Sequence, residues 1–182
     1  MSTLEVNNIK DTGSNSLISS DGSGTFTINN GVLKNTPAFQ AYLNTSQSIP
    51  NATYTKAELT NVSWDTDSAF DNTTNYRFTV PSGKAGKYAF YGTVFFDDLN
   101  LDDSGALRPY LNGNSISNSP GPAQTNQIFG SASAQNVFVT YYGILDLAVG
   151  DYVELFLYQN TGAAINARST NTQFGGYKLI GA

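Results

Sequence analysis

Short runs of alternating apolar and polar residues dominate the chain, and turn-forming residues separate them. No stretch keeps the i, i+3, i+4, i+7 apolar spacing of an amphipathic helix, so the pattern predicts strands. The predicted strands cover residues 38–43, 56–62, 76–80, 86–96, 106–111, 136–147, 152–159 and 173–180. About eight strands in a segment of this length are typical of a two-sheet jelly roll. We therefore expect an all-β sandwich of two antiparallel sheets.

The composition favours strands and supplies their core. Tyr and Phe number 11 each, and charged residues make up only 13% of the 182 residues. Aromatic side chains suit a pleated, half-buried surface, whereas Lys, Glu and Ala suit it poorly. Period-two alternation predicts inward-facing side chains for Phe39, Tyr42, Tyr88, Phe90, Phe138, Tyr141, Val153, Leu155, Leu157 and Tyr177.

Residues 1–36 differ from the rest of the chain. Two strand-like triplets, 4–6 and 25–27, are separated by turn sequences rich in Asp, Ser, Asn and Gly. A segment this short cannot bury a core of its own. We expect it to be a β-structured attachment or stalk segment that precedes a head at 37–182. Its candidate attachment residues are Leu4, Val6 and Ile9.

The residue types that are missing narrow the chemistry. The chain has no His and no Cys, which excludes Ser-His-Asp and Cys-His nucleophile pairs and zinc–thiolate sites. A net charge of −5 with only 9 basic residues argues against a nucleic-acid partner. No apolar run approaches the roughly 20 residues of a membrane-spanning helix, and the N-terminus lacks the regions of a secretory signal. We expect a protein without a cofactor, without membrane insertion and without enzymatic activity.

Three sequence blocks occur in the order and spacing of one known kind of domain. They are FDNTTNYRF at 70–78 followed by GKYAFY at 86–91, LAVGDYVEL at 147–155, and FGGYKLI at 174–180. Together they resemble the globular head of complement C1q and its tumour-necrosis-factor-like relatives, over residues 37–182. The segment 79–85 is longer than the usual spacing of that family. The resemblance implies a ten-stranded jelly roll that assembles as a homotrimer, with aromatic side chains near the three-fold axis.

The resemblance and the aromatic content together suggest residues for the trimer interface and core. These candidates are Tyr88, Phe90, Phe95, Tyr141, Phe174, Tyr177 and Leu179. The adjacent pairs Tyr141–Tyr142 and Phe95–Phe96 cannot both point inward in a regular strand. One member of each pair must face solvent, the trimer axis or a neighbouring protein, and we expect the trimer axis.

The first residues resemble the short β segments that precede such heads in phage tail-fibre and virion proteins, and no collagen-like Gly-X-Y run is present. We therefore expect a phage virion structural protein, assembled in the host cytoplasm and located in the particle. It would be a trimeric tail-fibre or knob module that attaches to other virion proteins through residues 1–36. Its head would bind a host-surface glycan or protein. The alternatives are a capsid or tail decoration protein without a receptor role, and a secreted lectin-like module.

One acidic cluster is a candidate calcium site. Asp98, Asn100, Asp102 and Asp103 carry oxygen ligands of the kind that calcium binds. The cluster lacks the Gly and the final Glu of the helix–loop–helix calcium motif. A solvated loop between strands is the alternative interpretation.

Other polar and aromatic residues have two interpretations each. Asp65, Asp67 and Asp71 could include a carboxylate pair for glycoside hydrolysis, or be ordinary surface acids. Trp64 could stack on a sugar ring, or close one end of the core. The unpatterned stretch 113–133 is a candidate recognition loop.

Overall fold

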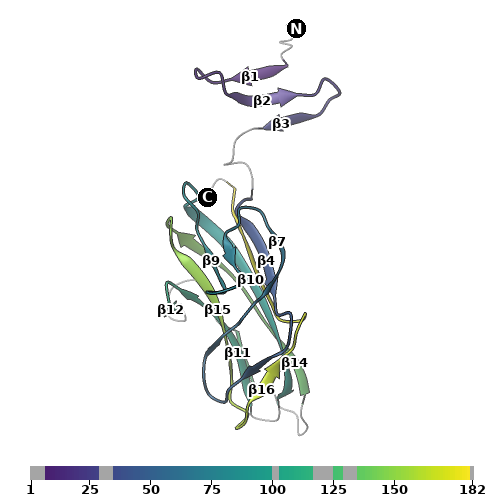
Figure 1. The fold of residues 1–182 in the computed structure, drawn as a ribbon, viewed down its shortest axis with the longest axis vertical. Coiled ribbons are helices and arrows are strands. Elements are labelled where there is room, and N and C mark those ends of the chain that lie inside the picture. Colours follow the sequence, from purple (N-terminus) through teal and green to yellow (C-terminus); the bar gives the residue numbers. More distant parts are fainter. Residues whose placement is uncertain (1–6, 29–34, 100–102, 117–124, 129–134, 181–182) are drawn as a thin grey trace.

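The computed structural model describes residues 7–28, 35–99, 103–116, 125–128 and 135–180. Within these ranges the chain is all β, with no helix. Figure 1 shows a small N-terminal sheet beyond one end of an elongated head. The strands of the small sheet fall before residue 29 and those of the head begin at Ala38.

The N-terminal sheet is a three-stranded antiparallel meander. It consists of β1 (Asn8–Lys10), β2 (Ser16–Ser20) and β3 (Phe26–Ile28). Aspartates shape both turns: Asp11 accepts a hydrogen bond from the Asn15 amide at 2.9 Å, and Asp21 accepts one from the Ser23 amide at 2.8 Å. The Asx turn at Asp21 and the longer turn closed by Asp11 reverse the chain tightly enough for neighbouring strands to pair.

The head consists of two antiparallel sheets, each named here after its central strand. The β10 sheet has the order β5 (Gln47–Ile49), β16 (Ile165–Ala167), β10 (Gly86–Leu99), β17 (Gln173–Lys178), β4 (Ala38–Tyr42) and β7 (Asn61–Asp65), and β14 (Gln135–Leu147) also pairs with β10. The β15 sheet has the order β12 (Asn114–Ser115), β11 (Ser104–Leu111), β15 (Tyr152–Gln159), β9 (Arg77–Thr79) and β8 (Phe70–Asp71), with β13 (Thr125–Ile128) on β11 and β6 (Thr55–Lys56) on β15.

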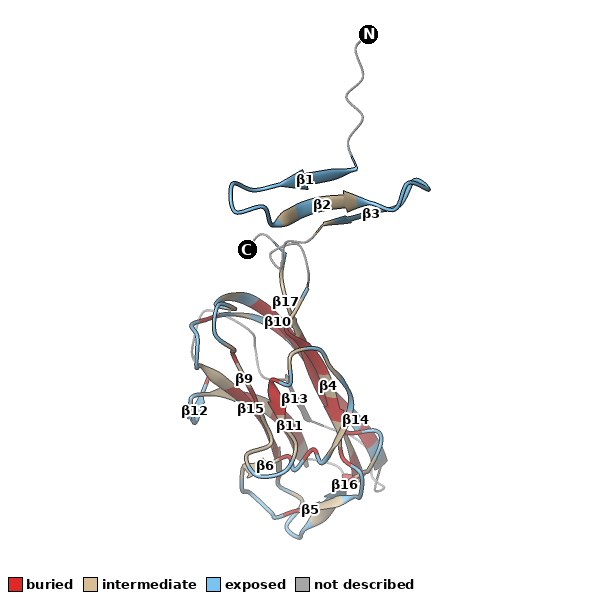
Figure 2. Ribbon diagram, turned by 45° about the horizontal axis from the view of Figure 1, so that its top comes forward, coloured by how far each residue is buried: buried red, intermediate tan, exposed pale blue. Residues whose placement is uncertain are grey.

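Aromatic rings from both sheets meet in one core. Phe39 of β4 stacks on Phe70 and Phe78 of the β15 sheet, with ring centroids 4.9 and 5.0 Å apart. Phe90 and Phe174 stack beside it at 5.7 Å. All five side chains belong to a single buried cluster, and Figure 2 shows that β4 and β10 are largely buried. The two sheets are therefore held together by the hydrophobic effect and by ring packing.

Three aromatic residues that the sequence predicts to face inward lie on the opposite side of their strands. Phe138 is 48% exposed, and Tyr42 and Tyr177 are half-buried. Each lies three residues from a core aromatic residue, namely Tyr141, Phe39 and Phe174. Residues three apart in a strand point to opposite faces, so both members of such a pair cannot reach the core. The inward prediction was wrong for these three.

The predicted strand at 56–62 is wrong as one continuous strand, because only its two ends lie in strands, β6 and β7. Here the chain crosses from β6 in the β15 sheet to β7 in the β10 sheet. Ala57 and Leu59 are fully buried while Glu58 and Thr60 are exposed. The alternation therefore reflects a connection that covers the end of the core. The stretch 113–133, predicted to be a loop, contains β12 and β13.

Candidate functional site

The side of the β10 sheet that faces away from the core carries a set of aromatic and apolar side chains, with polar residues such as Gln40 and Gln173 among them. We call it the aromatic face, and its members are Tyr42, Trp64, Tyr91, Phe95, Phe138, Tyr142, Ile144 and Tyr177. They alternate with core residues along β10 and β14, as the pleat requires. The exposed fractions of Tyr142, Phe138 and Ile144 are 62%, 48% and 45%.

Strand register places these side chains next to one another. Tyr91 is paired with Tyr142, and Phe95 with Phe138, whose ring centroids are 4.3 Å apart in an edge-to-face arrangement. At the other edge of the sheet, Trp64 of β7 is paired with Gln40 of β4 on the same face. The Gln40 side chain donates a hydrogen bond to Gln173 at 2.7 Å. The face therefore crosses five strands, from β14 to β7.

Glycines in β17 leave room for the aromatic rings of β10. A Cβ atom on Gly175 would be 2.3 Å from the Tyr91 ring, on the aromatic face. A Cβ atom on Gly176 would be 2.6 Å from the Phe90 ring, in the core. The Gly-Gly pair is therefore required by close ring packing on both sides of the sheet.

Charged groups lie at one end of the aromatic face. The Arg168 guanidinium is 4.5 Å from the Phe95 ring centroid and forms an ion pair with Asp97 at 2.6 Å. Burial raises the pKa of the Tyr91 hydroxyl, with a smaller contribution from Tyr177. An apolar centre with charged groups at its margin is the usual anatomy of a protein interface.

The predicted interface and core residues divide between the two sides of the β10 sheet. Tyr88, Phe90, Tyr141 and Phe174 lie in the core, whereas Phe95 and Tyr177 belong to the aromatic face. Leu179 is half-buried, and its backbone amide donates a hydrogen bond to Lys87 at 2.8 Å. Of the attachment candidates, Ile9 lies in β1 and is 46% exposed. Leu4 and Val6 lie outside the described residues.

Trp64 is 40% exposed and lies on the outside of the β10 sheet. The prediction that it closes one end of the core was therefore wrong. The prediction that one member of the pair Tyr141–Tyr142 faces outward was right, and the outward member is Tyr142. Sequence reasoning missed that Phe138 and Ile144 lie beside it. In β14 the residues at 138, 142 and 144 alternate with the buried residues Val137, Val139 and Tyr141. This period of two could have identified them from the sequence.

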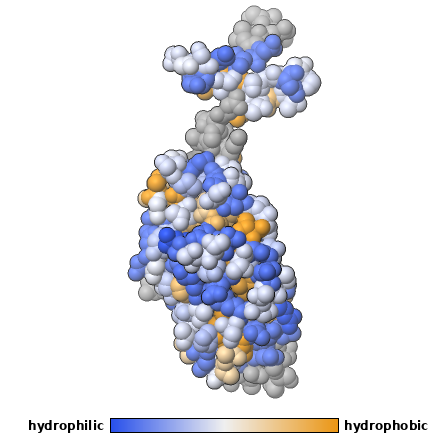
Figure 3. All heavy atoms as spheres, viewed as in Figure 1, coloured by the Kyte–Doolittle hydropathy of each residue, from blue (hydrophilic) through white to orange (hydrophobic). Residues whose placement is uncertain are grey.

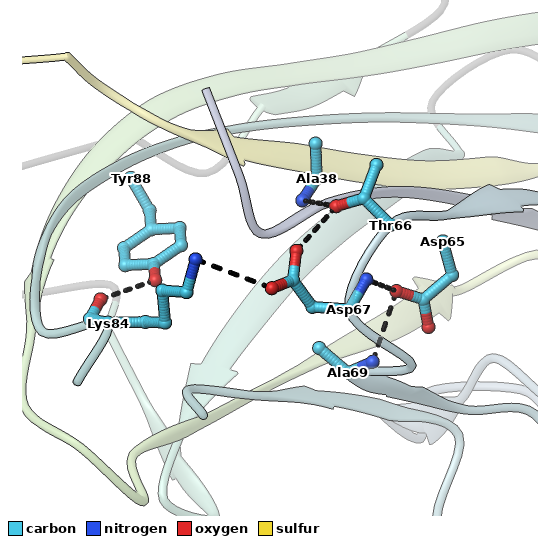
Figure 4. A network of polar contacts seen from close by, with 7 residues as sticks. All are labelled: Ala38, Asp65, Thr66, Asp67, Ala69, Lys84 and Tyr88. Atoms are coloured by element: carbon cyan, nitrogen blue, oxygen red, sulfur yellow. Dashed lines mark hydrogen bonds and ion pairs between the residues drawn. The ribbon is translucent and has the colours of Figure 1, made fainter. Parts of the chain in front are cut away.

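The carboxylates proposed for hydrolysis hold loops together instead (Figure 4). Asp65 accepts hydrogen bonds from the amides of Asp67, Ala69 and Phe70 at 3.3, 3.0 and 2.8 Å. Asp67 accepts a hydrogen bond from Thr66 at 2.7 Å and lies 3.4 Å from Lys84 in an ion pair. Both carboxylates thus hold the segment between β7 and β8, and Asp67 also links it to the segment before β10.

Asp71 caps the turn that follows β8. It accepts hydrogen bonds from the amides of Thr73, Thr74 and Asn75 at 2.9, 3.0 and 3.2 Å. The amide of Thr74, followed by that of Thr73, holds the pKa of the Asp71 carboxyl far below its usual range. Such a group is a structural anion and not a proton donor near neutral pH.

The calcium candidate falls partly outside the described residues, which omit Asn100 and Asp102. Asp98 is exposed, has a φ of 58°, and lies within the register shift of β10 between Phe96 and Leu99. Asp103 is half-buried. Among the described residues no group of three or more acidic side chains could hold a metal ion.

A second aromatic cluster lies on the outside of the β15 sheet, on the opposite side of the sandwich. This Tyr54 cluster consists of Tyr54, Arg108, Tyr110, Phe156 and Tyr158. Tyr54 stacks on Tyr158 at 4.8 Å, and Tyr110 stacks on Phe156 at 4.0 Å. The Arg108 guanidinium lies 4.2 Å from the Tyr54 ring centroid. Figure 3 shows one side of the molecule, where small hydrophobic areas interrupt a mostly hydrophilic surface.

None of the described residues forms a helix that is long and apolar enough to cross a membrane. No family model matches the chain, and no curated protein matches it in sequence.

Solved structures are similar in fold at low sequence identity. The globular domain of the zebrafish complement 1qA protein matches with a TM-score of 0.50 and 18% identity, over 79% of this chain and 97% of that one. The Eiger tumour necrosis factor of S. frugiperda matches with a TM-score of 0.54 and 16% identity, over 80% of this chain and 93% of that one. The head is therefore an all-β, C1q/TNF-like jelly-roll sandwich, as the sequence blocks predicted.

Proposed function

We propose that the chain is a homotrimeric structural and binding module whose aromatic face packs against the neighbouring chains. The observation that supports this is the exposure of Tyr142, Phe138, Ile144 and Trp64 on one sheet. Large apolar patches on a soluble domain mark interaction surfaces, and aromatic residues are enriched at interface centres. The C1q/TNF-like fold is consistent with three copies around one axis.

We further propose that the trimer is a phage virion component of the tail-fibre or knob type, attached through residues 1–36. The support is the small N-terminal sheet, which lies beyond one end of the head. Antibodies against the head, applied to purified virions of the phage that encodes the chain, test this by electron microscopy. Labelling at the tail supports the proposal, and labelling over the shell favours a decoration protein. Absence from particles combined with presence in the medium contradicts both roles and favours a secreted lectin-like module.

Host-surface binding is the proposed task of the head. When the β10 sheets pack in the trimer, the Tyr54 cluster on the other sheet stays on the outside. Ring faces with an adjacent guanidinium suit a sugar or a protein surface with acceptor groups.

Purified protein added to host cells before infection should reduce phage adsorption. The double variant Tyr54→Ala, Arg108→Ala should not compete, whereas a variant of the exposed turn residue Val149, Val149→Ser, should. Unchanged adsorption at saturating wild-type protein would contradict a receptor role.

A further inference from the structure

The N-terminal sheet has one apolar side that its own chain leaves uncovered. Register pairs Ile9 with Ile18 and Ile18 with Ile28, so the three isoleucines form a row across all three strands. Phe26 lies two residues before Ile28 and therefore shares its side. Ile9 is 46% exposed and Phe26 is 63% exposed, and Figure 2 shows the three strands as exposed or intermediate. We call this side the isoleucine face.

This small sheet needs a partner for stability. Its strands have only three, five and three residues, and it has a single layer. A sheet of this size is stable only if its apolar side packs against something. The ordered turns at Asp11 and Asp21 position the strands but bury almost no apolar surface.

We propose that the partner of the isoleucine face is the same face in the two other copies of the trimer, so that three N-terminal sheets pack together as a stalk. The charge distribution favours self-association, because the charged residues of 7–28 are Lys10, Asp11 and Asp21, at a strand end and in the turns. The row of isoleucines itself carries no charge, so three copies of it do not repel one another. Ile9, an attachment candidate, would then face the neighbouring copies and leave Leu4 and Val6 for the particle.

Connection to the head supplies the effective concentration. The chain from Ile28 to Pro37 is short, and a residue spans at most about 3.5 Å. It leads directly into β4, which belongs to the sheet with the aromatic face. Trimerisation of the heads therefore brings three N-terminal sheets within reach of one another, which converts a weak association into an intramolecular one. The inference rests on the proposed trimer.

Hydrogen exchange in the purified full chain tests the stalk. Amides of β2 should exchange on the order of 100-fold more slowly than in an unfolded chain. Ile18→Asn should abolish this protection and leave the head amides unchanged. The matched control is Leu17→Asn, because Leu17 is the residue next to Ile18, is 41% exposed, and has no partner in either neighbouring strand. It should keep the protection.

A monomeric head separates the possible partners. The variant Tyr142→Asp, designed to disrupt the aromatic face, should lose protection in β2 although the N-terminal sequence is intact. Protection that persists in this monomer would show that the sheet is covered by its own chain and would overturn the stalk. A wild-type trimer without protection in β2 would overturn the stalk alone and favour a virion protein as the partner. A wild-type monomer would overturn the trimer and the stalk together.

Discussion

Two buried tyrosines differ in whether their hydroxyl groups find an acceptor. The Tyr88 hydroxyl donates a hydrogen bond to the Lys84 carbonyl at 2.6 Å, and burial raises its pKa to about 12. The Tyr141 hydroxyl is buried without a partner among the described residues, and burial raises its pKa as well. A buried hydroxyl without a hydrogen bond costs free energy, whereas a bonded one contributes modestly.

Removing the two hydroxyls should therefore have opposite effects on stability. We expect Tyr88→Phe to lower the free energy of unfolding by about 1 kcal/mol, and Tyr141→Phe to raise it by a similar amount. Urea titrations of both variants at neutral pH provide the measurement. Destabilisation by Tyr141→Phe would show that its hydroxyl is hydrogen-bonded and would contradict this account.

Asp71 should make stability depend on pH. Its pKa is lowered in the folded chain, so its stabilising contribution is present above the unfolded pKa of about 3.9. That contribution is lost as the pH falls towards the folded pKa. Asp71→Asn should lower the free energy of unfolding by about 1 kcal/mol at pH 7. The difference from wild type should shrink between about pH 5 and pH 2.

The control for this experiment is Glu58→Gln, because Glu58 is an exposed acid in the connection between β6 and β7. It also neutralises one carboxylate, and it should leave stability nearly unchanged over the whole pH range. If the difference in the free energy of unfolding between Asp71→Asn and wild type stays constant down to pH 2, the Asp71 carboxylate does not have the proposed role.

At the level of elements, β17 is restricted by its neighbours at two successive glycines. Gly176→Ala would place a methyl group 2.6 Å from the buried Phe90 ring and 3.0 Å from the Ala89 carbonyl oxygen. Such overpacking should cost about 2 kcal/mol. Gly175→Ala should cost less, because the outer end of the Tyr91 ring can move away on the sheet surface. Thermal unfolding of both variants measures the difference, and equal costs would contradict it.

The elements also show what the sequence can and cannot predict. Long alternating runs identified β10, β14, β15 and β17 because a half-buried strand imposes a period of two. Strands of two or three residues, such as β5 and β8, are too short to show any period. They form because long-range pairing places them, which a local pattern does not encode.

Side assignment on each strand was the main error within the candidate site. Period-two alternation, applied to each strand without fixing which residues share a side, predicts inward positions for the aromatic residues 138, 42 and 177. Each of the three lies three residues from a core aromatic residue, Tyr141, Phe39 or Phe174, and therefore points to the opposite face of its strand. This spacing rule could have been applied to the sequence alone. That all these outward residues lie on one sheet, beside Trp64, follows only from the strand order.

For the whole molecule, the aromatic face is the feature that a single chain leaves unexplained. Tyr142→Asp should break the trimer, because it places a charge at the residue with 62% exposure on that face. Val149→Asp is the matched control, since Val149 is 51% exposed but lies in the turn between β14 and β15. Sedimentation velocity should show smaller particles for Tyr142→Asp only. Dissociation by both variants, or by neither, would count against the face as the interface.

The mass of the full chain in solution, measured by light scattering, tests the central claim most directly. The proposed assembly predicts three times the 19.5 kDa of one chain. A mass equal to that of a single chain would contradict the trimer.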